Sequence, residues 1–120
     1  MTPLHLVAME YRGSAKVVST LVQAGANVNA LNSDQESPLH VASLWNPVAV
    51  PILVGAGCKV NLLNDWGTSP LFLVAFFSGQ DRSAVAALMS AGADPYLGKS
   101  PLTHHVVSDE IKDYIRSLSK

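Results

Sequence analysis

The residues of this 120-residue chain best suited to chemistry are four histidines and one cysteine. His5 and His40 lie far apart in the sequence, whereas His104 and His105 are adjacent. Neighbouring side chains on a helix diverge by about 100°, so the adjacent pair does not readily chelate one metal ion. A zinc site would also need thiolate or carboxylate partners at ligand spacing, and Cys58 is the only thiol. We therefore predict no bound metal and no other cofactor.

Arrangements for nucleophilic or acid–base catalysis are also missing from the sequence. It contains no nucleophile elbow, zincin helix, P-loop or kinase motif set. Asp34 with Glu36, and Asp109 with Glu110, are acidic pairs that a loop tip and a helix start explain better than catalysis does. The sequence therefore offers no positive reason to predict an enzyme.

Composition and charge exclude several other classes of protein. Apolar residues make up 48% of the chain, which argues against disorder, and charged residues only 14%, against roughly 25% in a typical soluble protein. Eight basic and nine acidic residues leave no basic excess for nucleic acid or an anionic membrane. No apolar run reaches the ~18 residues that span a bilayer. With a single cysteine and no recognisable signal peptide, we expect an intracellular protein, cytoplasmic or nuclear.

An internal repeat organises the chain. The tripeptide Thr/Ser-Pro-Leu occurs four times, starting at Thr2, Ser37, Ser69 and Ser100. A second motif, which begins Ala-Gly, recurs in step with it from Ala24, Ala56 and Ala91. Two signals in phase at a period of about 33 residues indicate stacked supersecondary units. We predict a single domain, 1–120, of four repeats with approximate bounds 1–32, 33–64, 65–97 and 98–120.

Each repeat is predicted to contain two helices. Ser37 can cap a first helix whose first position is Pro38, and a second helix ends at a glycine such as Gly57, which can adopt a left-handed conformation. Pro51 removes a backbone hydrogen bond from the second helix of its repeat, so we expect that helix to start late or bend. Cys58 stands where the sister repeats have alanine, which predicts a small buried filler.

The motifs Thr2-Pro3-Leu4-His5 and Gly25-Ala26-Asn27-Val28-Asn29-Ala30 resemble the signature and the end of the ankyrin repeat. The resemblance implies an all-α solenoid of about four helix-turn-helix repeats, joined by short projecting β-hairpin loops, here called fingers. It also implies that His5 and His40 support the fold by bonding to backbone in the neighbouring finger. The implied function is binding of another protein, as an adaptor or scaffold, through the concave face.

The fourth repeat departs from this pattern. Residues 29–37 and 61–69 are each long enough for a finger, whereas residues 96–100 leave room only for a tight turn at Gly98. A first helix carrying His104 and His105 is expected to end at 107–108. Residues 108–118 then form a helix with an apolar stripe, as a truncated terminal cap would.

The expected concave face gathers large apolar residues that a solenoid does not need there. The predicted binding residues are Leu44, Trp45, Phe76 and Phe77 at first-helix ends and Trp66 in the second finger, with an acidic rim of Glu10, Asp34, Glu36 and Asp65. Clustered exposed aromatics are typical interface anchors. The predicted partner is a protein segment with apolar anchors and basic residues. In the alternative, some of these side chains, Phe76 foremost, turn inward and pack between repeats.

Two other functions stay open at this stage. Asn29 and Asn61 resemble the acceptors of asparagine hydroxylation in ankyrin repeats, although the usual acid two residues earlier is replaced by Asn27 and Lys59. The chain could also be a regulatory fragment of a larger multidomain protein or enzyme.

Overall fold

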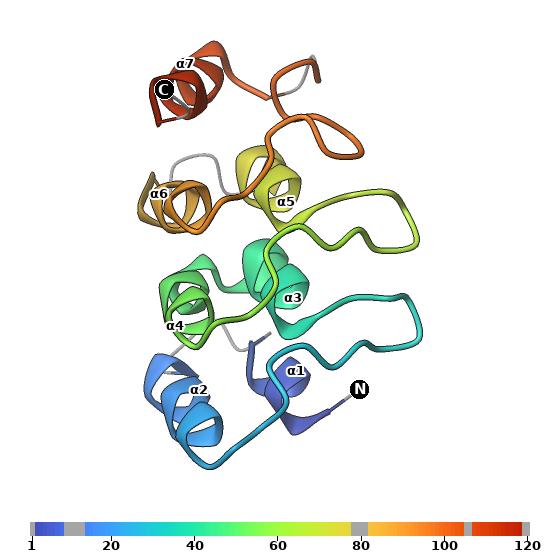
Figure 1. Cartoon of the computed structure of the whole chain (residues 1–120), viewed down its shortest axis with the longest axis vertical. Helices are drawn as coiled ribbons and strands as arrows, with labels where there is room; N and C mark the ends of the chain where they lie inside the picture. The colour runs from blue at the N-terminus through green and yellow to red at the C-terminus, as the bar shows by residue number, and fades with distance from the viewer. Residues whose placement is uncertain (1, 9–13, 78–81, 105–106, 119–120) are drawn as a thin grey trace.

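Helices stacked in two columns form the architecture. The computed structural model describes residues 2–8, 14–77, 82–104 and 107–118. Figure 1 shows α1, α3 and α5 above one another, with α2, α4, α6 and α7 in the second column and the loops projecting beside the first. Within the described ranges all regular elements are helical: α1 (Pro3–Ala8), α2 (Ser14–Gln23), α3 (Pro38–Trp45), the 3-10 helix η1 (Pro47–Ala49), α4 (Val50–Gly55), α5 (Pro70–Phe77), α6 (Arg82–Ser90) and α7 (Asp109–Leu118).

Reciprocal capping begins α3. The Ser37 hydroxyl accepts the His40 backbone N–H at 3.2 Å, and His40 Nδ1 accepts the Ser37 backbone N–H at 3.2 Å. With Nδ1 as the acceptor, Nε2–H donates to the Thr68 carbonyl oxygen of the next finger, at 3.1 Å. His5 makes the equivalent bond to the Glu36 carbonyl oxygen, at 2.8 Å. The predicted structural role of both histidines is confirmed.

The second helices end and begin as the sequence predicts. Gly57 has φ +83° and ends α4 without the steric penalty that a Cβ would bring. Upstream, Pro47 starts the short η1 and α4 begins only at Val50, so the late start expected from Pro51 is confirmed.

The hydrophobic core lies between the two columns of helices and extends along the whole stack. The largest side chains with almost no exposure include Leu4, Leu39, Leu53, Leu71, Leu88 and Ile115. Cys58 is also buried, and burial raises the pKa of its thiol to about 11. A thiol with so high a pKa is protonated at neutral pH and therefore unreactive, as expected of a filler.

Both fingers are organised by an asparagine at the base. Asn64 Oδ1 accepts hydrogen bonds from the Trp66 N–H at 3.0 Å, the Thr68 N–H at 3.0 Å and the Thr68 hydroxyl at 2.8 Å. Asn32 plays the same part in the first finger, where it accepts from the backbone N–H groups of Asp34 and Glu36. The fingers are thus hairpin turns held from inside, and the described residues contain no β-strand.

The fourth repeat differs from the prediction in one respect. A tight turn forms at Gly98, as expected, but residues 101–103 form only a turn and His104 lies outside any helix. The prediction of a first helix there is wrong, and His105 lies outside the described residues. Ser100 explains the difference, because its hydroxyl donates to the Pro95 carbonyl oxygen at 2.7 Å and accepts from the Leu102 N–H at 3.1 Å. These bonds close a tight turn in place of a helix cap.

The terminal helix α7 is amphipathic, with part of the expected stripe inside. Ile111 and Ile115 are buried, Tyr114 is half-buried, and Leu118 is exposed. Tyr114 also lies beneath the guanidinium of Arg82, 4.8 Å from the ring centroid, which connects α7 to α6. One face of α7 therefore closes the stack while the opposite face stays in solvent.

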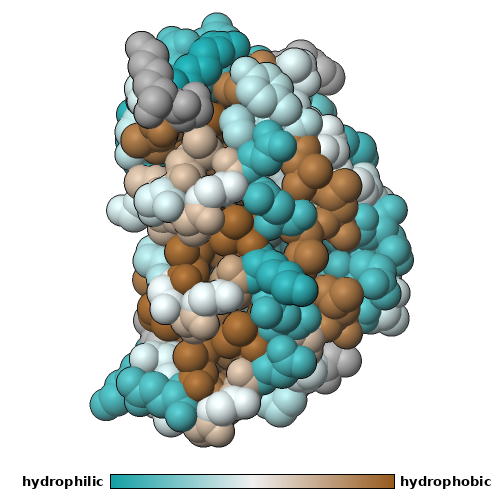
Figure 2. Space-filling model, in the orientation of Figure 1, coloured by the Kyte–Doolittle hydropathy of each residue, from teal (hydrophilic) through white to brown (hydrophobic). Residues whose placement is uncertain are grey.

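The face of the molecule seen in Figure 1 is mixed in character. In Figure 2, brown apolar patches and teal hydrophilic patches alternate on that face. No helix among the described residues is both long and apolar enough to cross a lipid bilayer.

Candidate functional site

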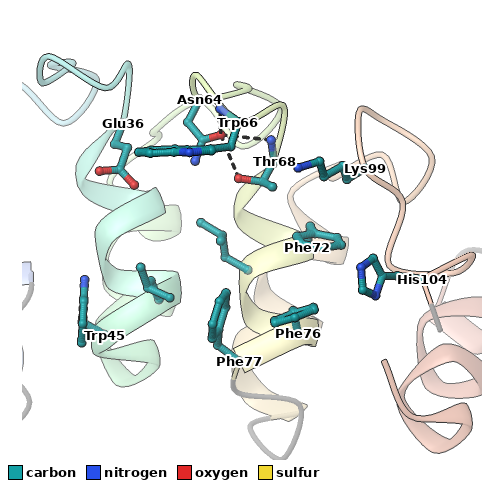
Figure 3. A pocket seen from close by; sticks show the side chains of 12 residues that line it. Glu36, Trp45, Asn64, Trp66, Thr68, Phe72, Phe76, Phe77, Lys99 and His104 are labelled. Atoms are coloured by element: carbon teal, nitrogen blue, oxygen red, sulfur yellow. Dashed lines mark hydrogen bonds between the residues drawn. The ribbon is translucent and has the colours of Figure 1, made fainter. Parts of the chain in front are cut away.

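A groove of about 740 Å³ lies along the first helices and the fingers. It crosses from α3 over α5 to the loop that precedes α7 (Figure 3). Its lining is Glu36, Leu44, Trp45, Asn64, Trp66, Thr68, Phe72, Leu73, Phe76, Phe77, Lys99 and His104. Every predicted apolar binding residue lines this groove.

Three aromatic side chains form the edges of the groove. Trp66 projects from the second finger on one side, and Trp45 and Phe77 stand at the ends of α3 and α5 on the other (Figure 3). Their exposed fractions are 54% for Trp45, 56% for Trp66 and 56% for Phe77. Neither indole stacks on another ring within the part of the chain that the structure describes. These two side chains therefore contribute little to the core.

The floor of the groove is a second, packed aromatic cluster. Phe72 is buried and stacks on Phe76 with ring centroids 5.4 Å apart, and His104 meets both rings edge-on at 5.4 and 5.1 Å. Phe76 is only half-buried and lies 4.6 Å from the ring of Phe77. Phe76 thus combines the two predicted roles, because it packs against the core and also lines the groove.

Six lining residues are absent from the predicted binding set: Asn64, Thr68, Phe72, Leu73, Lys99 and His104. The sequence of α5, PLFLVAFF, is apolar on all sides, so no periodicity singles out the face of Phe72. Lys99 and His104 are brought to the groove by the shortened loop of the fourth repeat. The sequence does show that shortening, but not where the loop then goes.

The predicted acidic rim is only partly present. Glu36 lines the groove, whereas Asp34 and Asp65 do not. Those two residues lie at the finger tips, where the Asp65 N–H donates to the Asp34 carbonyl oxygen at 3.0 Å. Glu10 lies outside the described residues. Among the described residues, Glu36 is thus the one predicted acid that lines the groove, and Lys99 adds a base that was not predicted.

Asn29 and Asn61 occupy structural positions between repeats. Asn29 Oδ1 accepts the Lys59 backbone N–H at 2.8 Å, and Asn61 Oδ1 accepts the Asp94 backbone N–H at 2.8 Å. Asn61 Nδ2 also donates to the Gly92 carbonyl oxygen at 3.0 Å. Both carboxamides thus hold neighbouring repeats together.

The described ranges hold no cluster of three or more His, Cys, Asp or Glu side chains that could coordinate an ion. The groove itself offers apolar surface, a carboxylate, an ammonium and an imidazole. Such a lining suits recognition of an apolar segment with charged neighbours.

Comparison with known proteins defines the class. The sequence matches the family described as "Ankyrin repeats (3 copies)" over residues 1–62, and the chain belongs to the ankyrin repeat family. Ankyrin repeats are in general protein–protein interaction modules, and the fold is typically non-enzymatic.

Among solved structures, the chain is similar to the crystal structure of the human ASB11 ankyrin repeat domain. The two are 30% identical with a TM-score of 0.81, over 98% of this chain and 53% of that one. The chain thus spans about half the length of that domain. No curated protein matches the sequence.

Proposed function

We propose that the chain is an adaptor or scaffold module that binds an apolar segment of a partner protein in the groove between Trp45, Trp66 and Phe77. The observation that carries the proposal is the exposure of three large aromatic side chains around one apolar floor. A contiguous patch of exposed apolar side chains is typical of a surface that a partner covers. The four repeats proposed from the sequence would form a single binding domain.

The energetics of the edge residues support this proposal. Tryptophan is enriched among interface residues whose truncation costs most, because a large rigid ring becomes buried at a low cost in conformational entropy. Trp45 and Trp66 each have more than half of their surface available for such burial. We therefore expect these two residues to be the main anchors of a partner. In this proposal the protein acts inside the cell and catalyses no reaction.

Selection from a random peptide library, followed by titration of the selected peptides, tests the proposal. We expect Trp45→Ala and Trp66→Ala each to weaken binding by about 2 kcal/mol or more, roughly 30-fold. Tyr96→Ala is the matched control, because Tyr96 is 68% exposed and does not line the groove. The control should bind like the parent chain.

Circular dichroism of the same variants separates binding from folding. Both tryptophan variants should keep the helical spectrum and the unfolding midpoint of the parent. Loss of the fold in either variant would favour the alternative in which these side chains pack between repeats. Equal weakening by Tyr96→Ala would place the binding surface elsewhere.

A further inference from the structure

The two ends of the groove carry opposite charges. Glu36 lies at the end next to α3, and Lys99 lies beyond α5 with Trp66 between them (Figure 3). Within the described ranges these are the only acidic and basic side chains among the lining residues, His104 aside. Neither forms a salt bridge with another described residue, the one such bridge there being Arg116 with Asp113. Each charge is therefore available to a partner.

Glu36 is held in place by the base of the first finger. Its backbone N–H donates to Asn32 Oδ1 at 2.9 Å, and its carbonyl oxygen accepts from His5 at 2.8 Å. One carboxylate oxygen accepts from Asn32 Nδ2 at 3.2 Å. The remaining carboxylate oxygen makes no hydrogen bond to another described residue. The Glu36 side chain is thus half-buried and oriented by Asn32, and one of its carboxylate oxygens has no hydrogen-bond partner among the described residues.

Lys99 is held in place by the shortened loop. Its backbone N–H donates to the Gly67 carbonyl oxygen of the second finger at 3.0 Å. The loop can approach so closely because residue 98 is glycine, with φ +60°. A Cβ on Gly98 would collide with that same oxygen and lie 2.7 Å from the side chain of Leu63. Because this loop is shorter than the two fingers, Lys99 lies beside the second finger, at the far end of the groove.

From this placement we propose that the partner segment carries both charges: a basic side chain beside Glu36, an apolar anchor between the aromatic edges, and an acidic side chain beside Lys99. The proposal rests on the proposed function and adds the charge pattern of its ligand. Charges at the two ends of a partly desolvated interface select against segments that place like charge there. A segment with two basic or two acidic residues satisfies one end of the groove and repels the other.

Helix spacing limits the distance between the two charges of the ligand. Glu36 precedes α3, whereas Lys99 follows the repeat of α5, so one to two helix spacings of ~10 Å separate them. An extended chain advances ~3.3 Å per residue, which corresponds to roughly three to six residues. We expect the basic and acidic residues of the partner to be separated by about that many positions.

Charge reversal on both molecules tests the pattern. The probes are three peptide pools with the same central Leu and Phe residues: Arg and Glu at opposite ends three to six residues apart, Arg at both ends, or Glu at both ends. The parent chain should prefer the mixed pool by at least about threefold over either of the others. Glu36→Lys should shift the preference to the doubly acidic pool, and Lys99→Glu to the doubly basic pool. The double variant should prefer the mixed pool again.

Matched reversals outside the groove complete the test. Asp34→Lys changes an exposed acid of the same finger, and Lys59→Glu an exposed base of another loop, and neither residue lines the groove. Both should keep the preference of the parent. Equal binding of all three pools, or a preference unchanged by Glu36→Lys and Lys99→Glu, would overturn the charge pattern and leave the proposed function standing. Binding of no pool, with Trp45→Ala also without effect on selected peptides, would overturn both.

Discussion

The base of each finger and the edge of the groove are close neighbours with opposite physical character. In the second finger, Asn64 and Thr68 at the base are buried and joined by hydrogen bonds. Trp66, between them in sequence, is more than half exposed and uses only its backbone N–H. The base therefore fixes the position of the finger, while most of the Trp66 side chain stays in solvent. Residues 64–68 thus contain both the buried side chains that stabilise the finger and an exposed side chain that lines the groove.

Substitution at the base of the second finger should cause the largest change in the free energy of unfolding. Asn64→Ala leaves the buried N–H and hydroxyl of Thr68 without their acceptor, so we expect the free energy of unfolding to fall by about 3 kcal/mol. Urea denaturation measures the loss. Asn64→Asp keeps an oxygen acceptor and should recover most of it, and Trp66→Ala should change stability by less than about 0.5 kcal/mol. A larger loss for Trp66→Ala than for Asn64→Ala would reverse the assignment of base and edge.

The turn that carries Lys99 provides an intermediate effect. Gly98→Ala adds both a positive-φ penalty and a contact with the Gly67 carbonyl oxygen, and we expect it to cost about 2 kcal/mol. Gly67→Ala is the matched control, because Gly67 also has positive φ, +72°, but no atom lies within 4 Å of an added Cβ. It should cost about 1 kcal/mol. Thermal unfolding of the two variants isolates the contact, and equal midpoints would argue against a close approach at Gly98.

Lowering the pH should cause the smallest change in the free energy of unfolding, and it should act through His40. Burial lowers the pKa of His40 below its ordinary value of 6.5. The unfolded chain therefore binds a proton at His40 before the folded chain does. The free energy of unfolding is then fully retained above pH 6.5 and falls as the pH drops towards the folded-state pKa, by less than about 1 kcal/mol at pH 6. Urea titrations from pH 7.5 to 5 measure this fall, which should be shallower in His40→Gln. An identical pH dependence in that variant would show that other groups cause it.

The same contrast explains which features the sequence could predict. Ser37 and His40 recur in the first repeat as Thr2 and His5, so the resemblance to the ankyrin signature predicts the contact of each histidine with the finger that follows it. No other repeat has tryptophan at the positions of Trp45 and Trp66, although Phe77 ends α5 where Trp45 ends α3. Only their size and their place at variable positions mark them, and their exposure had to come from the structure.

Other features depend on backbone contacts that the repeat motifs do not encode. Ser100 repeats the serine of the capping motif, but its hydroxyl bonds to Pro95, so the same local signal closes a turn. Lys99 reaches the groove through a backbone bond to Gly67, more than 30 residues earlier. Neither bond has a local signature, and for that reason the basic end of the groove was not predicted.

The carboxamides of Asn29 and Asn61 lie at the loops after the second helices and connect each repeat to the next. These bonds act as fixed-length ties along one column of the solenoid, whereas the groove follows the other column. A bond that fixes the distance between two neighbouring repeats on one side also restricts their spacing on the other side, where Trp45 of α3 and Phe77 of α5 lie. The spacing of these two aromatic side chains along one edge of the groove thus depends in part on residues that do not line it.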